Sequence, residues 1–137
     1  MSKSYYISMN PEKSSNNHIN IALSNLDNIP NYSANNLICD CLEFVQTSFL
    51  NSVVSQILDK LGPNGILHLS IYNMRYDIKK YMDNKLEAQS LLSTIKKYNS
   101  IINLDYIMSL LNNQQFTIQQ VEHTDNRTNI YIMRQAL

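Results

Sequence analysis

An amphipathic helix between two short apolar runs constrains the fold of this chain more than any other feature. Apolar side chains at residues 49–61 follow an i, i+1, i+4, i+5 rhythm, which is the broad stripe of a helix that packs on a core. The apolar runs at 37–42 and 66–71 flank it, and each predicts a buried strand. Strand, helix and strand in this order predict a right-handed βαβ unit with parallel strands. The sequence therefore predicts an α/β fold.

Turn and cap signals set the expected limits of this helix. Thr47 or Ser48 is the expected N-cap, because a hydroxyl oxygen can accept a hydrogen bond from a free N–H of the first turn. Gly62 with Pro63 is expected to end the helix, since glycine and proline are frequent just beyond helix ends. We expect the stretch Gly62-Pro63-Asn64-Gly65 to turn the chain into the following strand.

The remaining residues predict further elements of one domain that spans residues 1–137. The expected elements are strands at 4–9 and 18–23, a loop at 25–36, helices at 75–83 and 86–98, a short helix with Asn103 as its N-cap, and strands at 116–121 and 129–133. The last two strands flank a turn at 124–127, which predicts an antiparallel hairpin.

Composition narrows the class of partner and the location. Eleven basic and eleven acidic residues leave no stripe for a phosphate backbone, so we expect no nucleic-acid partner. No apolar run approaches the roughly 18 residues of a membrane-spanning helix, and we expect no membrane partner. Residues 1–17 lack the apolar region of a secretory signal, which predicts a cytoplasmic protein. The 19 asparagines suggest an AT-rich genome and would suit a phage or virus, with the protein then in the virion or the host cytoplasm.

Four segments carry a resemblance to a known family. Residues 27–38 read DNIPNYSANNLI, residues 41–45 read CLEFV, residues 61–67 read LGPNGIL, and residues 103–111 followed by 116–118 read NLDYIMSLL and FTI. In this order they resemble the "D…lP…ns.D.I", "vLEHV", "LkPGG.l" and "l..lL...GF.i" motifs of class I S-adenosylmethionine-dependent methyltransferases. Phe44, Asn64 and Gln115 stand where the family has His, Gly and Gly. The resemblance covers residues 19–133.

The resemblance also implies what this chain lacks. In the family the cofactor sits at a glycine-rich loop after the first strand, where glycine lets the backbone approach the ligand closely. The only glycines here are Gly62 and Gly65, and the alignment makes residues 18–23 the third strand. We therefore expect a small Rossmann-like, mostly parallel sheet with a C-terminal antiparallel hairpin and with the first βαβ unit missing. We also expect no cofactor.

Three residues are weak candidates for a surviving ligand site, and no residue is predicted to be catalytic. Asp40 and Asn73 follow predicted strands, and open α/β sheets bind ligands at strand ends. Asp27 would correspond to the acid that contacts adenine in the family. The alternatives are structural: Asp27 forms a turn, and Asp40 accepts hydrogen bonds from nearby backbone N–H groups. Glu43 is expected to be a helix-start or surface charge.

We expect no metal site and no nucleophilic thiol. Cys39 and Cys41, at i and i+2 in a strand, point to one face and cannot easily bridge each other. Structural zinc usually uses C-x₂₋₄-C, and His18, His68 and His123 lie on separate segments. An apolar context raises a thiol pKa. The lysines and tyrosines of residues 75–98 are better explained as a solvated helix face than as an RNA-binding surface.

These observations favour a non-catalytic, methyltransferase-like module that acts through protein–protein interaction, as a structural or assembly component. Loss of half a doubly wound sheet exposes an edge that must be covered, so we expect a homo-oligomer or a larger complex. The strand at 4–9 is expected to patch part of that edge. One alternative is a minimal S-adenosylmethionine-dependent methyltransferase, or a subunit whose cofactor site a partner completes. Another is a small-molecule-binding domain that uses the crevice near Asp27, Asp40 and Asn73.

Overall fold

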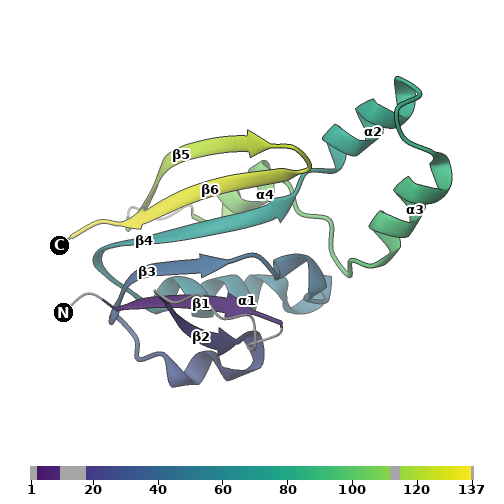
Figure 1. Ribbon diagram of the computed structural model, residues 1–137. Helices are drawn as coiled ribbons and strands as arrows, with labels where there is room; N and C mark the ends of the chain where they lie inside the picture. Colours follow the sequence, from purple (N-terminus) through teal and green to yellow (C-terminus); the bar gives the residue numbers. More distant parts are fainter. Residues whose placement is uncertain (1–2, 10–17, 112–114, 137) are drawn as a thin grey trace.

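The computed structural model describes residues 3–9, 18–111 and 115–136, which form a six-stranded sheet with helices (Figure 1). The strands are β1 (Ser4–Ser8), β2 (Ile19–Ala22), β3 (Ala34–Cys39), β4 (Leu61–Tyr72), β5 (Phe116–Thr124) and β6 (Arg127–Arg134). Their order is β2-β1-β3-β4-β6-β5. The first four run parallel, and β6 pairs antiparallel with both β4 and β5. The predicted fold class, a mostly parallel sheet with a C-terminal antiparallel hairpin, is confirmed.

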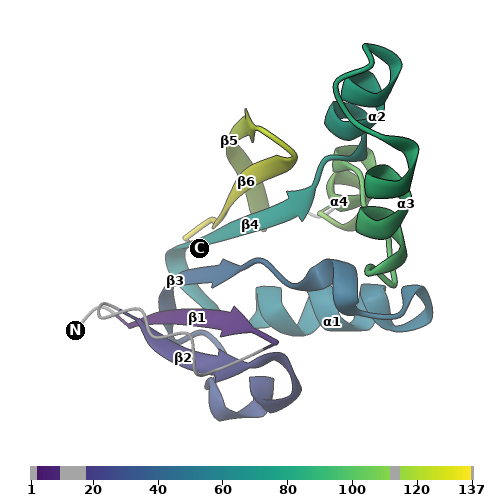
Figure 2. The ribbon, with the colours of Figure 1, turned by 45° about the vertical axis from the view of Figure 1, so that its right-hand side comes forward.

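The helices fall into two groups. The helical elements are the 3-10 turns η1 (Leu23–Asn28) and η2 (Leu42–Phe44) and the helices α1 (Thr47–Asp59), α2 (Met74–Met82), α3 (Ala88–Lys96) and α4 (Leu104–Leu110). α1 and α4 lie against one face of the sheet, whereas α2 and α3 project beyond its end (Figures 1 and 2). No residue of α3 is buried, so the projecting pair adds little to the core.

The predicted βαβ unit is β3, α1 and β4, and its two strands are parallel as expected. α1 buries Leu50, Val54, Ile57 and Leu58 against the sheet. In β4 the buried Leu67, Leu69 and Ile71 alternate with the half-buried His68 and Ser70. Because successive strand residues point to opposite faces, this alternation means that only one face of β4 meets the helices.

The stretch from Gly62 to Gly65 has a different role from the one predicted. It belongs to β4, which begins at Leu61, and the pairing with β3 shifts register there. A Cβ on Gly65 would lie 2.5 Å from the backbone oxygen of Ala34, so the glycine permits a close approach of two strands. The predicted turn is present as a bulge inside β4, because Asn64 has a left-handed φ of 59° and residues 62–65 stand opposite Asn35 alone.

The predicted caps of α1 were also wrong. Gln46 is the N-cap and makes no side-chain capping hydrogen bond, and Lys60 is the C-cap. The hydrogen bonds of the Lys60 N–H to the oxygens of Ile57 and Leu58 end the helix before Gly62. The Asn103 cap of α4 is confirmed, since its side-chain oxygen accepts the N–H of Tyr106 at 2.8 Å.

β1 lies inside the sheet and pairs in parallel with β2 on one side and β3 on the other. The expectation that this N-terminal strand covers an edge of the sheet is thus confirmed for β3. On this side of the sheet the edge strand is β2, which has four residues. Such a short edge strand offers few unpaired backbone groups to another chain.

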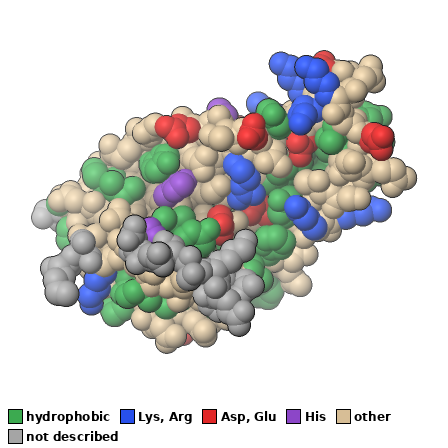
Figure 3. All heavy atoms as spheres, in the orientation of Figure 1, with side chains coloured by type: hydrophobic (Ala, Val, Ile, Leu, Met, Phe, Trp, Pro, Cys, Tyr) green, Lys and Arg blue, Asp and Glu red, His purple; other side chains and the backbone are tan. Residues whose placement is uncertain are grey.

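The second face of the sheet carries no helix among the described residues. We call it the open face and define it by Tyr6, Ile38, Ile66, His68, Ser70, Arg127, Asn129, Tyr131 and Met133, all half-buried. Figure 3 is drawn from this side and shows hydrophobic, histidine and charged side chains next to one another. Parallel sheets are usually covered on both faces, so a one-sided arrangement is unusual for this sheet type.

Candidate functional site

The carboxyl ends of β1, β3 and β4 meet at one edge of the sheet (Figure 1). From β1 the chain moves to β2 on one side and then to β3 on the other, which makes a topological switch point between β1 and β3. Open α/β sheets bind ligands at such a point, outside the carboxyl ends of the strands. The side chains that surround this edge therefore form the candidate site.

Asp40 directly follows β3 and lies at the switch point. The Tyr6 hydroxyl of β1 donates a hydrogen bond to Asp40 Oδ2, so the two strands are joined through side chains. Burial, helped by this hydrogen bond, raises the pKa of Tyr6 to about 12. The phenol therefore stays protonated and keeps donating at neutral pH. The predicted alternative, in which Asp40 is satisfied by backbone N–H groups, missed Tyr6.

A buried ion pair stands beside Asp40. Glu43 of η2 is wholly buried, and its Oε1 lies 2.8 Å from the Arg127 guanidinium and accepts the Tyr72 N–H at 2.5 Å. Arg127 also donates to the backbone oxygen of Ser70 at 2.8 Å. This cluster joins the ends of β3, β4 and β6. Glu43 does stand at a helix start, in the first turn of η2, but the prediction of a surface charge was wrong, because its partner Arg127 lies far away in sequence.

The environment of Glu43 alters its protonation. Burial raises the pKa of the Glu43 carboxyl above its ordinary value, and the nearby Arg127 only partly offsets this effect. The second carboxyl oxygen, Oε2, is buried and has no hydrogen-bond partner among the described residues. A carboxyl group in this state exchanges its proton closer to neutral pH than a solvated one does.

The structure separates the three residues predicted as weak ligand-site candidates. Asp40 lies at the switch point, and Asn73 follows β4, where its N–H donates to the Asn126 oxygen at 2.6 Å. Asp27 lies in η1 beyond the edge strand β2 and is exposed. Asp40 and Asn73 thus end neighbouring strands, while Asp27 stands apart from both. Arg127 is the residue of this edge that the sequence did not single out, and Glu43 was not predicted to belong to a site.

A cavity of about 310 Å³ opens at the carboxyl ends of β1 and β2. Its lining residues are Met9, Ala22, Leu23, Ser24, Val45 and Val53. Ser24 is the only polar side chain among them. The walls suit the flat, apolar part of a ligand, such as a heterocyclic ring.

The two cysteines lie side by side in the core. Cys39 and Cys41 are free and buried, and their sulfur atoms are 4.0 Å apart. The hydrogen bond with Cys39, together with burial, raises the pKa of the Cys41 thiol. Over residues 3–9, 18–111 and 115–136, no three His, Cys, Asp or Glu side chains are grouped to hold a metal ion. In the same ranges no helix is long and apolar enough to cross a membrane.

The fold class of this chain is defined by four features: the mostly parallel sheet, the β3-α1-β4 crossover, the switch point and the terminal hairpin. The fold is that of class I S-adenosylmethionine-dependent methyltransferases. Similar solved structures include the CurJ carbon methyltransferase, with a TM-score of 0.60 and 12% identity over 98% of this chain. The chain spans about half of that protein, 49% of its length.

Two further structures match a larger share of their own length. An S-adenosylmethionine-dependent methyltransferase from Thermotoga maritima has a TM-score of 0.63 and 12% identity, with 98% of this chain and 83% of that chain covered. An S-adenosylmethionine-dependent methyltransferase from Mesorhizobium loti has a TM-score of 0.61 and 10% identity, with 96% of this chain and 90% of that chain covered. At these identities the likeness concerns the fold. No protein-family model and no curated protein sequence matches this chain.

These comparisons correct one expectation. The prediction of no cofactor was wrong, because the structures that share the fold are S-adenosylmethionine-dependent methyltransferases and point to that cofactor. The prediction relied on the lack of glycine near the N-terminus. The apolar cavity beside β1 and β2 fits the adenine ring of this cofactor. Among its described lining residues only Ser24 could bind a ribose hydroxyl, so the fit covers one part of the molecule.

Proposed function

We propose that this chain is a methyltransferase-like subunit that acts by binding another protein chain, a second copy of itself, through the open face of its sheet. We further propose that S-adenosylmethionine binds at the carboxyl ends of β1 and β2. When bound, this cofactor supplies an activated methyl group. The chain contributes structure and binding to such an assembly.

The observation that carries this proposal is the one-sided cover of the sheet. The described helices α1 and α4 pack on the same face, and His68, Ser70 and Tyr131 are left half-buried on the other. The two rings of His68 and Tyr131 stack with centroids 4.5 Å apart, which makes a flat aromatic patch in the middle of the face. Aromatic side chains of this kind are common at the centre of protein interfaces.

Charge favours a second copy as the partner. The chain has no net charge at pH 7, so two copies meet without long-range repulsion. The strand register places Glu122 of β5 beside Asn129, on the same side as Arg127. A face with both signs of charge can pair with itself across a two-fold axis.

Association is tested by light scattering and sedimentation over a range of concentrations. We expect a concentration-dependent dimer, and Tyr131→Glu should raise the dimer dissociation constant at least about tenfold by placing a charge in the interface. Tyr81→Glu is the matched control, because Tyr81 is an exposed tyrosine on the projecting α2. A monomer at concentrations on the order of 100 μM, or equal effects of the two variants, would refute the self-association.

Cofactor binding is tested separately by calorimetry with S-adenosylmethionine and S-adenosylhomocysteine. Ser24 lines the cavity beside β1 and β2, whereas its exposed neighbour Asn25 does not. Ser24→Trp should therefore block binding and Asn25→Trp should leave it intact. No binding by the associated wild-type protein, or equal binding by both variants, contradicts the cofactor proposal without affecting the association result.

A further inference from the structure

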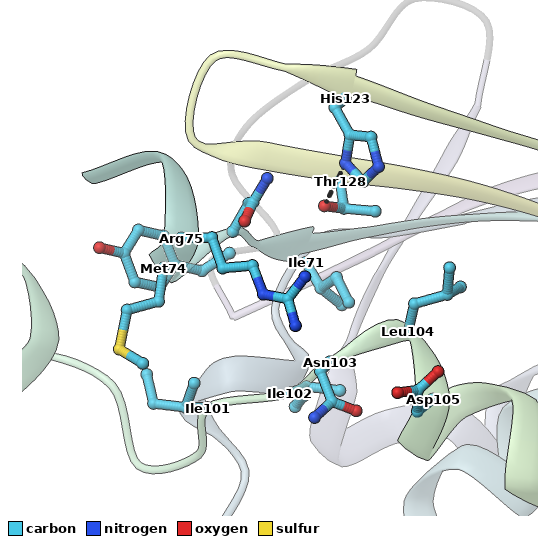
Figure 4. Close-up of a pocket in the computed structure, with 12 residues that line it drawn as sticks. Ile71, Met74, Arg75, Ile101, Ile102, Asn103, Leu104, Asp105, His123 and Thr128 are labelled. Carbon is cyan, nitrogen blue, oxygen red and sulfur yellow. Dashed lines mark hydrogen bonds between the residues drawn. The ribbon is translucent and has the colours of Figure 1, made fainter. Parts of the chain in front are cut away.

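A second cavity of about 340 Å³ lies at the end of β4, between the start of α4 and the β5-β6 hairpin (Figure 4). It is on the helix-covered side of the sheet, away from the open face and from the cavity at β1 and β2. Its floor includes the buried Ile71 and Ile102, and the start of α2 stands above it. This size and this apolar floor are typical of small-molecule sites.

Polar side chains from three elements meet at the rim. Arg75 of α2 extends into the cavity, with its guanidinium toward Asn103 and Ile71 (Figure 4). Asp105 belongs to the first turn of α4, and His123 enters from β5. Residues that are distant in sequence therefore place one cationic, one anionic and two neutral polar groups around an apolar floor.

The hydrogen bonds within the protein leave several of these groups available. Among the described residues the side chains of Arg75 and Asp105 have no hydrogen-bond or ion-pair partner. Asn103 uses its side-chain oxygen to accept the Tyr106 N–H, so its amide NH₂ can still donate. His123 is held by Thr128 Oγ1 at 3.0 Å through Nδ1, which leaves its Nε2 toward solvent or ligand.

We propose that this cavity binds a zwitterionic small molecule of amino-acid type with an apolar side chain. The ligand carboxylate lies between the Arg75 guanidinium and the Asn103 amide, since an arginine fork matches two carboxylate oxygens. The ligand ammonium lies against the Asp105 carboxylate. The apolar side chain covers Ile71 and Ile102. This proposal is independent of the proposed function, because it uses neither the open face nor the residues at β1 and β2.

Three probes with the same isobutyl group separate the contributions of the charged groups. Leucine carries both charges, 4-methylpentanoate only the carboxylate, and 3-methylbutylamine only the ammonium. Titration followed by amide NMR shifts should show saturable leucine binding, with a dissociation constant on the order of 1 mM or tighter. The two single-charge probes should bind at least about tenfold more weakly, because each loses one charge-assisted contact. Equal shifts with all three probes, or no saturation with leucine, would overturn the proposal.

Variants assign the two charged contacts. Arg75→Gln should weaken leucine binding about tenfold to a hundredfold and abolish the preference for leucine over 3-methylbutylamine. Asp105→Asn should likewise abolish the preference over 4-methylpentanoate. Lys79→Gln is the control, because Lys79 is an exposed cation of the same helix outside the cavity. All three positions are exposed, so circular dichroism should show an unchanged fold. Equal loss of binding in Lys79→Gln, or none in Arg75→Gln, refutes the site.

Discussion

The ion pair between Glu43 and Arg127 should contribute strongly to the stability of the fold where β3 and β4 end. Replacing Glu43 with leucine tests this. Leucine fills a comparable volume but leaves the buried Tyr72 N–H without its acceptor and Arg127 without its counter-charge. Removal of one member of a buried pair costs about 3–5 kcal/mol. We take the lower end, about 3 kcal/mol, because 26% of the Arg127 side chain is exposed and can be partly solvated.

The assay is thermal and urea unfolding followed by circular dichroism. For a chain of this size, about 3 kcal/mol corresponds to a decrease of roughly 10 °C in Tm. The double variant Glu43→Leu/Arg127→Met should be more stable than the sum of the two single losses, since no uncompensated charge remains. Glu87→Leu, at an exposed glutamate just before α3, is the control and should change stability little. If Glu43→Leu costs less than about 1 kcal/mol, or if the losses simply add, the ion pair does not support the fold as argued.

Three further predictions concern Glu43, Gly65 and the two cysteines. Burial raises the pKa of Glu43 above its ordinary value of 4.5, so the folded state holds the proton more tightly than the unfolded chain. This contribution to the free energy of unfolding is complete below pH 4.5 and is lost as the pH rises through the folded-state pKa of Glu43. In urea titrations Glu43→Gln should therefore not show this loss of stability with rising pH. Gly65→Ala should destabilise the protein by about 2 kcal/mol or more in urea unfolding, because its Cβ would lie 2.5 Å from the Ala34 oxygen. Cys39 and Cys41 should react with a thiol reagent only on unfolding, and rapid labelling of the native protein would contradict their burial.

Local sequence patterns were sufficient for the elements whose signals are periodic. The stripe of α1 and the apolar run of β4 identified the βαβ unit, and the Asn103 cap identified the start of α4. Alternation in β5 and β6 identified the hairpin. In each case residues close together in sequence decide which element forms, so a window of the sequence contains the required information.

Features that depend on distant partners could not be predicted in this way. Glu43 is buried because Arg127 and the Tyr72 N–H neutralise it, and nothing near Glu43 in the sequence identifies either partner. The apolar residues on both sides of Glu43, Leu42 and Phe44, are the local sign of its burial. Gly65 allows a close approach to the Ala34 oxygen, which lies on another strand. The residues next to Gly65 in the sequence give no sign of this strand, so they indicate only a turn.

Arg127 links the strand-end cluster to the open face, and this leads to a final prediction. Its guanidinium holds Glu43, while the rest of the side chain lies on the face proposed to bind a second copy. A partner that covers Arg127 removes water from the pair and strengthens the attraction between its charges. Glu43→Gln should therefore weaken self-association although Glu43 itself is buried and cannot touch the partner. Sedimentation of Glu43→Gln beside the exposed control Asp83→Asn measures this coupling, and equal dimer dissociation constants for the two variants would show that the face and the ion pair act independently.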